Sequence, residues 1–203
     1  MRPILKTSVA AAITILAALP IAAQSEMLGV PGPISFKGED YALAWTSQPS
    51  DNYVKQEYVP EGQGVENYED MILVEALTGK MTPMEAAATK VQSLEARKGR
   101  DPVLNYDVLQ NDATGEVLLD FLVSDLEANP IIVEWNAYRY RPLPNGEGVV
   151  LMGISRRGYD EAGAASFMTG LGAMRSEAID ALAAMSFPKV SIVRRVTSSL
   201  VPR

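Results

Sequence analysis

Histidine and cysteine are both absent from this chain of 203 residues. Without imidazole, Ser-His-Asp hydrolysis, histidine general bases, histidine haem ligands and HExxH zinc sites are excluded. Without thiols, cysteine nucleophiles and thiolate metal sites are excluded. A folded chain of this size hides about 70% of its extended-chain surface, so it needs no disulfide or metal for stability. The two absences therefore limit the chemistry of the protein and leave its folding unaffected.

A long uncharged apolar stretch, Thr7–Ala23, follows a basic start that contains Arg2 and Lys6. A positive start, a short apolar centre and small residues before the cut are typical of a secretory signal peptide, so we expect residues 1–23 to be removed. The stretch is slightly short for a membrane span, which needs about 20 residues. The alternative is an uncleaved inner-membrane anchor that faces the periplasm.

Basic residues are outnumbered by acidic ones, 18 against 25. Cleavage of the signal would remove two of the 18, which leaves 16 against 25 and a formal charge of −9. Such a surface repels nucleic acid and anionic lipid headgroups. An export signal without cysteine indicates a bacterial periplasmic protein with no nucleic-acid partner.

The rest of the chain divides into three parts. Residues 24–38 are rich in glycine and proline and predict a flexible arm. Residues 39–197 predict a single α+β domain. The end of the chain, Leu200–Arg203, matches the remnant of a thrombin cleavage site, so we expect 198–203 to be an added tail. A native tail with the same letters is the alternative.

The centre of the domain contains four predicted strands, which indicate an antiparallel meander. They are rich in Val, Ile, Leu and aromatic residues, and short turn-forming connectors of five or six residues separate them. The predicted strands are Leu104–Leu109, Glu116–Ser124, Ile131–Tyr140 and Gly148–Arg157. In the last hairpin we expect Arg141 opposite Val149 and an ion pair between Glu134 and Arg156. We expect the Arg139–Arg141 end of its first strand to be exposed.

The segment before the meander predicts a hairpin, a buried strand and a helix. The hairpin comprises Tyr41–Thr46 and Tyr53–Val59, and the apolar run Met71–Ala76 predicts a strand. A capping box, Thr82-Pro83-Met84-Glu85, starts the helix. Its packing face should carry Met84, Ala87, Ala88, Val91 and Leu94.

The segment after the meander predicts a second helix that begins at Asp160 and ends near Ser186. Gly170 and Gly172 each weaken a helix by about 1 kcal/mol, so we expect a kink or break between its halves. These two glycines do not form a convincing phosphate loop, since a third glycine and a preceding strand are missing. Val190–Val193 predicts a final edge strand.

One concentration of aromatic and basic residues is the candidate ligand site. Stacking and bidentate hydrogen bonds from such residues suit an anionic or sugar-like ligand. The alternative is that the aromatic rings pack under helices while the arginines pair with local acids. The candidate residues are Trp135, Tyr138, Arg139, Tyr140, Arg141 and Arg156.

Eight acidic residues between positions 39 and 70 suggest two other sites, and neither is well supported. Oxygen ligands suit Ca²⁺, but the EF-hand spacing is missing, so a solvated acidic loop is the better interpretation. A carboxylate-based enzyme would use Glu61, Glu66, Glu69 and Asp70. The eight are Glu39, Asp40, Asp51, Glu57, Glu61, Glu66, Glu69 and Asp70.

The stretch Glu57–Gln63, followed by Glu66-Asn67-Tyr68 and Met71, resembles a pattern in uncharacterised exported bacterial proteins. The order of hairpin, loop, strand, helix, antiparallel strands and long helix is similar to the Mog1/PsbP-like α+β sandwich. Members of such folds mostly act as accessory or assembly modules, so the resemblance implies binding and transfers no site residue.

Three functions follow as hypotheses. The first is a non-enzymatic periplasmic module that binds a protein partner, such as an inner-membrane complex. The second is a carrier of a small ligand at the Tyr/Arg end of the sheet. The third, and least supported, is a carboxylate-based enzyme. None of them requires a metal or other cofactor.

Overall fold

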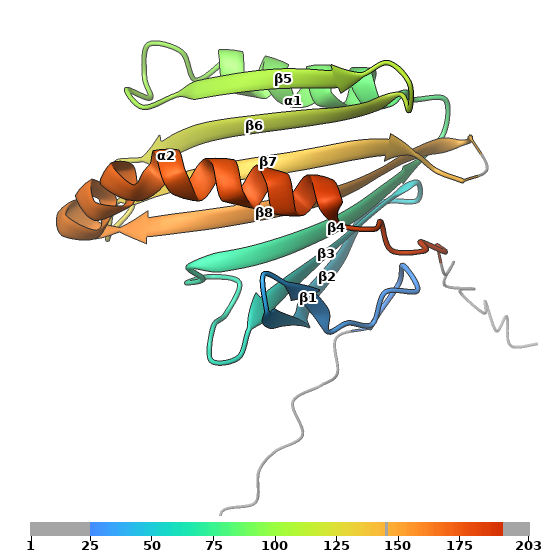
Figure 1. Ribbon diagram of the computed structural model, residues 1–203, viewed down its shortest axis with the longest axis horizontal. Helices are drawn as coiled ribbons and strands as arrows, with labels where there is room; N and C mark the ends of the chain where they lie inside the picture. Colours follow the sequence, from blue (N-terminus) through green and yellow to red (C-terminus); the bar gives the residue numbers. More distant parts are fainter. Residues whose placement is uncertain (1–24, 145, 193–203) are drawn as a thin grey trace, which may run out of the picture.

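A computed structural model describes residues 25–144 and 146–192. The predicted signal peptide and the predicted tail lie outside these residues. Eight strands form one antiparallel sheet in the spatial order β1-β2-β3-β4-β8-β7-β6-β5, and two helices pack on it (Figure 1). The elements are β1 (Ile34–Phe36), β2 (Glu39–Ser50), β3 (Tyr53–Pro60), β4 (Asp70–Thr78), α1 (Pro83–Glu95), β5 (Asn105–Asn111), β6 (Glu116–Asp125), β7 (Ile132–Pro142), β8 (Gly148–Tyr159) and α2 (Asp160–Ala184). This arrangement confirms the predicted α+β class with an antiparallel sheet and two helices.

The two helices lie on opposite faces of the sheet, which we call the α1 face and the α2 face. Trp135 and Ala137 of β7 pack with the core that includes Leu182 of α2. Tyr140, also on β7 but of opposite side-chain parity, packs with the core that includes Leu94 of α1. Figure 1 shows α2 in front of β7 and β8, with α1 on the far side of β5 and β6. Each face of the sheet therefore carries its own hydrophobic core.

The central meander and the N-terminal hairpin are confirmed, but the predicted register of the last hairpin is wrong. A hydrogen bond of 2.9 Å from the Leu143 N–H to the Gly148 carbonyl closes the loop, so the ladder begins with Pro142 opposite Val149. Every pair is shifted by one residue from expectation, and Glu134 faces Arg157. A shift of one residue changes which side chains share a face, because side chains alternate along a strand.

The Arg139–Arg141 end of β7 is not exposed as expected. The guanidinium of Arg139 pairs with Glu116 at 2.8 Å and donates to the Leu182 and Met185 carbonyls at the end of α2. The Arg139 side chain is only 16% exposed. Cations are favoured near a helix C-terminus, where the last carbonyls lack partners within the helix. Arg139 therefore fastens the end of α2 to the sheet.

Helix α1 begins as its capping box predicts. The Thr82 hydroxyl accepts from the Glu85 N–H at 3.2 Å, and the Glu85 carboxylate accepts from the Thr82 N–H at 2.8 Å. Ala87 and Leu94 are buried, whereas Met84 and Ala88 are exposed. The buried stripe is thus narrower than predicted, and part of the sheet beside α1 remains uncovered.

Helix α2 runs without a break from Asp160 to Ala184, so the predicted kink at Gly170 and Gly172 is wrong. Both glycines face open space, and packing of the flanking residues on the α2 face outweighs their weak helix propensity. Asp160 is the first helical residue, and its carboxylate accepts from the Gly163 N–H at 2.8 Å. Among the described residues, no helix combines the length and the apolar character that crossing a membrane requires.

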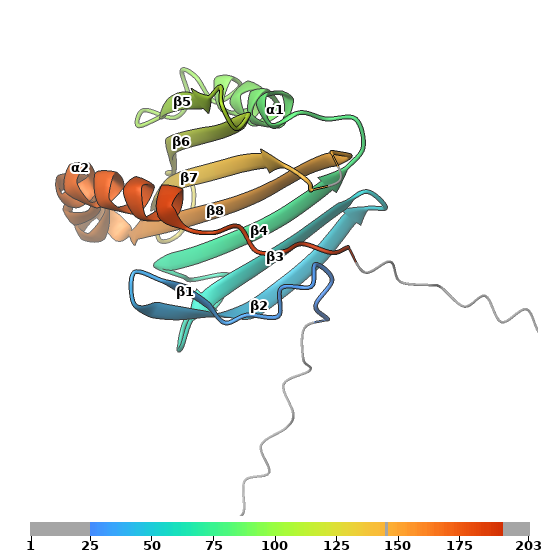
Figure 2. The same ribbon diagram turned by 45° about the vertical axis from the view of Figure 1, so that its right-hand side comes forward.

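Residues 25–38 pack as part of the fold and do not form the flexible arm that their composition suggested. Met27 and Leu28 are buried on the α2 face, where the amide oxygen of Gln56 accepts from both of their N–H groups. The segment that follows α2 passes over the same half of the sheet (Figure 2), and the Ser191 N–H donates to the Leu28 carbonyl at 2.7 Å. The predicted strand at Val190–Val193 is absent through residue 192, where the chain is irregular.

Candidate functional site

A groove of about 450 Å³ lies between α1 and the uncovered part of the α1 face. It forms because α1 packs on β6 and β7 and leaves β3, β4 and β8 open beside it. Ligand pockets usually measure about 300–1,000 Å³ and have mostly apolar walls. We call it the α1 groove. Its lining residues are Tyr53, Lys55, Glu75, Leu77, Met81, Ala86, Thr89, Lys90, Ser93, Tyr138, Tyr140, Val149 and Leu151.

Two tyrosines of β7 form the floor of the α1 groove. Tyr138 meets Phe121 edge to face, with ring centroids 5.0 Å apart, and Tyr140 at 6.4 Å. Gly153 lies opposite Tyr138 on β8, and a Cβ at that position would come within 2.8 Å of the Tyr138 ring. Glycine at this position therefore gives the ring the space it occupies against the sheet.

Glu75 and its partners form the sheet-side wall of the groove. The Tyr53 hydroxyl donates to the Glu75 carboxylate at 2.6 Å, and the Lys55 ammonium lies 4.0 Å from the same carboxylate. Lys55 also pairs with Glu57 at 2.7 Å. Burial raises the pKa of Glu75, while the Tyr53 hydrogen bond and the charge of Lys55 oppose that shift. The carboxylate is thus already engaged by neighbours on the sheet.

Lys90 projects from α1 into the other wall. Its ammonium lies 4.8 Å from the centroid of the Phe121 ring and 5.7 Å from that of Tyr138. Among the described residues, no carboxylate comes within 4.0 Å of it, although Glu134 and Glu75 favour its charge from farther away. Burial lowers the pKa of Lys90 because the charged ammonium has lost part of its hydration.

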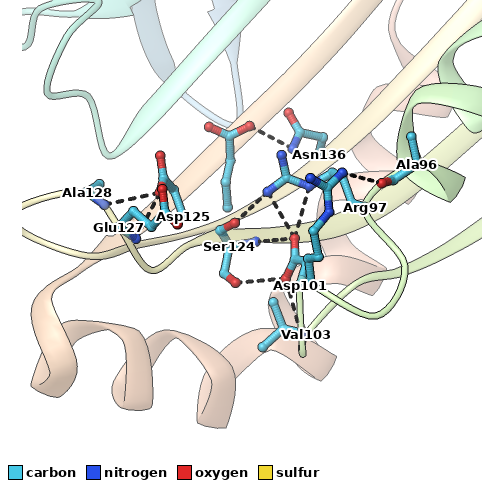
Figure 3. A network of polar contacts seen from close by, with 11 residues as sticks. Ala96, Arg97, Asp101, Val103, Ser124, Asp125, Glu127, Ala128 and Asn136 are labelled. Carbon is cyan, nitrogen blue, oxygen red and sulfur yellow. Dashed lines mark hydrogen bonds and ion pairs between the residues drawn. The ribbon is translucent and has the colours of Figure 1, made fainter.

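The far end of α1 is fixed to β6 by a buried carboxylate. Asp101, in the turn after the helix, accepts from the Ser124 N–H at 2.9 Å, the Ser124 hydroxyl at 2.7 Å and the Arg97 Nε at 3.1 Å (Figure 3). Burial alone would raise the pKa of Asp101, but the bonds from Ser124 and Arg97 outweigh it and hold that pKa below its usual range. This contact and the capping box fix both ends of the helix that forms the groove wall.

A protein-family model matches residues 28–187, which is well over half of the chain. The chain belongs to this family. The matched range includes every described strand and both helices, so both walls of the α1 groove lie within the unit that the family model covers. No curated protein matches the chain, and no solved structure does either.

The candidate ligand residues do not meet in one place. Tyr138 and Tyr140 lie in the α1 groove, while Trp135, Arg139 and Arg141 lie on the α2 face, because alternate residues of β7 point to opposite sides. The Trp135 indole N–H donates to Asp120 at 3.2 Å. The Arg141 guanidinium lies 5.0 Å from the Phe187 ring. On the α2 face, therefore, these groups already have partners within the fold.

Arg156, the last candidate residue, is also on the α2 face and forms an ion pair with Asp70. The predicted partner Glu134 instead binds Arg157 at 2.5 Å on the α1 face, as the corrected register requires. Glu134 also accepts from the Tyr68 hydroxyl at 2.9 Å. Both arginines are thus held by carboxylates on neighbouring strands.

The four acidic residues considered for catalysis do not all converge: Glu69 and Asp70 line one pocket with Arg156, and Glu61 and Glu66 are not among its lining residues. Glu61, Glu66 and Glu69 are exposed, and Asp70 is engaged by Arg156. Within residues 25–144 and 146–192, no three carboxylates come together as a possible metal site. Gly170 and Gly172 lie inside α2, where the backbone N–H groups serve the helix.

The charged residues of the α1 groove were not among the candidate ligand residues predicted from the sequence. Lys90 lies three residues after Ala87 and four before Leu94, on the inward stripe of a predicted amphipathic helix. An inward lysine on such a stripe was a usable signal. Tyr53, Lys55 and Glu57 alternate along β3 and so share one face of it, but their proximity to Lys90 depends on the sheet order, which the sequence does not show.

Proposed function

We propose that the protein is a non-catalytic binding protein that holds a small, largely apolar ligand in the α1 groove. The observation that carries this proposal is the groove itself: a space of about 450 Å³ with walls from α1 and four strands and a floor of two tyrosines. Its size and mostly apolar lining are those of ligand pockets. This is the small-ligand hypothesis, with the site moved to one face of the sheet.

A binding role is favoured over catalysis by the composition of the groove. Histidine, the commonest general base, and cysteine, a strong nucleophile, are absent from the sequence. Glu75 is the carboxylate among the groove residues, and it is engaged by Tyr53 and Lys55. The groove is therefore better suited to holding a molecule than to reacting with it.

We place this function in the periplasm, on the basis of the predicted signal in residues 1–23. Inner-membrane anchoring through the same segment is the alternative. We also propose that the fold is of the Mog1/PsbP type. One helix on each face of a central antiparallel sheet supports that assignment, and accessory binding roles are what it implies.

Blocking the groove tests the proposal. Thr89 and Ala88 are neighbouring exposed residues of α1, but only Thr89 lines the groove. We expect Thr89→Trp to weaken binding of the uncharged probe N-phenyl-1-naphthylamine at least about tenfold, measured by fluorescence titration, because the indole fills the space. Ala88→Trp is the matched control and should bind as the wild type does. Equal binding by both variants, or no binding by the wild type, contradicts the proposal.

A protein partner is a second candidate, favoured by the unequal edges of the sheet. Strand β1 is three residues long, whereas β5 has seven residues at the opposite edge and carries Leu109, which is 53% exposed. An exposed strand edge can accept an extended peptide as an additional strand. The occupant would be an extended segment of a membrane-complex subunit.

A pull-down with paired variants tests this second candidate. Leu109 and Leu126 are similarly exposed, but Leu126 lies in the loop after β6. The bait would be the mature protein, with solubilised membranes as the source of partners. We expect Leu109→Asp to abolish recovery of a partner and Leu126→Asp to retain it. Recovery that is the same with both variants would count against strand addition at β5.

A further inference from the structure

One cation of the α1 groove, Lys90, is available to a ligand. On the helix wall, the Thr89 hydroxyl donates to the Glu85 carbonyl at 2.9 Å and the Ser93 hydroxyl donates to the Lys90 carbonyl at 2.7 Å. Both hydroxyl protons are thus used within α1. The Lys90 ammonium, with three N–H groups and no carboxylate within 4.0 Å among the described residues, is the donor that this wall presents.

The floor of the groove presents two more donors. The hydroxyls of Tyr138 and Tyr140 have no hydrogen-bond partner among the described residues, and both residues line the groove. Burial raises the pKa of each phenol, so both stay protonated at physiological pH. A protonated phenol donates one hydrogen bond.

The carboxylate on the opposite wall already has partners on the sheet. Glu75 accepts from Tyr53, and Lys55 lies beside it. Its negative charge is therefore balanced from the sheet side. Among the described groove residues, the positive charge without a carboxylate within 4.0 Å therefore lies on the helix side, at Lys90, and the β8 side of the groove presents the apolar residues Val149 and Leu151.

We propose that the ligand of the α1 groove is an amphipathic anion, with its carboxylate or sulfonate at Lys90 and its apolar body on the β8 side of the floor. An anion there supplies the partner that the Lys90 ammonium lacks and accepts from the Tyr140 hydroxyl. The apolar body covers Val149 and Leu151. This inference rests on the proposed function and adds the charge of the ligand to it.

Two probes of similar shape separate the inference from the proposed function. Anilinonaphthalene sulfonate carries a negative charge, and N-phenyl-1-naphthylamine does not. We expect Lys90→Met to weaken binding of the sulfonate about 10- to 100-fold, the usual loss for a hydrogen bond to a charged group, while the uncharged probe binds as before or more tightly. Lys98 lies three residues after the end of α1 and pairs with Glu95. Lys98→Met is therefore the control, and it should leave the affinities for both probes unchanged.

A second variant keeps the test valid if Lys90→Met folds poorly. Tyr140→Phe keeps the ring and removes one donor, so we expect it to weaken sulfonate binding about threefold to tenfold and to leave the uncharged probe unaffected. Equal losses for both probes, or no loss for the sulfonate, would overturn the anionic assignment and leave the groove as a neutral-ligand site. Failure of the wild type to bind either probe overturns the proposed function and this inference together.

Discussion

Each face of the sheet has a packed core, and one charged group on each face differs from the other in its partners. On the α2 face, Asp120 is 4% exposed and accepts from the Trp135 indole N–H and from Arg175 of α2 at 2.6 and 2.7 Å. On the α1 face, Lys90 lies over two aromatic rings without a carboxylate within 4.0 Å among the described residues. A buried charge that has an ion-pair partner stabilises the fold, whereas a charge without such a partner can bind a ligand. This difference supports our proposal that the α1 face is the binding face, whereas the pair on the α2 face stabilises the fold.

Helix length explains much of this difference. Helix α2 has 25 residues and, together with the chain before β1 and after Ala184, covers its face from β7 to the β2–β3 region. Helix α1 has 13 residues, and its main packing is on β6 and β7. The shorter helix leaves room for the groove beside it.

Removing Asp120 should give the largest effect on stability. Asp120→Ala leaves the Trp135 N–H without its partner and breaks the pair with Arg175, so we expect a loss of about 2–3 kcal/mol in the free energy of unfolding. A urea titration measures it. Glu177→Ala breaks an exposed pair with Lys37 and should leave the urea midpoint unchanged. If the two variants behave alike, the α2 face does not depend on its buried pair.

The fold was largely predictable because its signals are local. Alternation within the meander, turn residues between strands and the Thr82–Glu85 capping box each act within a few residues. The register of the last hairpin was wrong by one residue because it depends on the bond that closes its loop, from Leu143 to Gly148. The continuity of α2 through Gly170 was mispredicted since packing outweighs a propensity penalty of about 1 kcal/mol.

Asp101 tests whether the position of α1 depends on its C-terminal contact. Asp101→Asn keeps the shape but weakens acceptance from Ser124 and Arg97, so we expect a loss of about 2 kcal/mol at pH 7, measured by urea titration. Because the pKa of Asp101 is lowered in the folded protein, its contribution is fully present above the ordinary aspartate value of about 4 and is lost as pH falls through the lowered value. The difference between variant and wild type should therefore shrink below about pH 4. A difference that stays constant with pH would show that the charge of Asp101 is not what matters.

The candidate site was less predictable than the fold. The sequence grouped Trp135 with Tyr138 and Arg139 because they are close along the chain, but strand alternation separates them onto two faces. The groove combines groups from β3, β4, α1, β7 and β8, and only the strand order, with β4 beside β8, brings them together. That pairing joins residues about 80 positions apart and leaves no local signal in the sequence.

Substitution of Glu75 should change the free energy of unfolding by a smaller amount, and in the opposite direction. Its pKa is raised chiefly by burial, so the folded protein loses stability as pH rises from the ordinary glutamate value of about 4 through the raised value. Glu75→Gln can still accept from Tyr53, and we expect it to raise the free energy of unfolding by about 1 kcal/mol at pH 7 and by nothing near pH 4. Thermal unfolding at both pH values measures this. A destabilised variant at pH 7 would mean that the pair with Lys55 outweighs the cost of burial.

The most direct test of the assignment of the two faces is a map of backbone amide shifts during titration with anilinonaphthalene sulfonate. We expect the shifted amides to cluster in residues 81–93, 138–140 and 149–151, around the α1 groove. Shifts that cluster instead along α2 and the strands beneath it would show that the ligand binds on the other face.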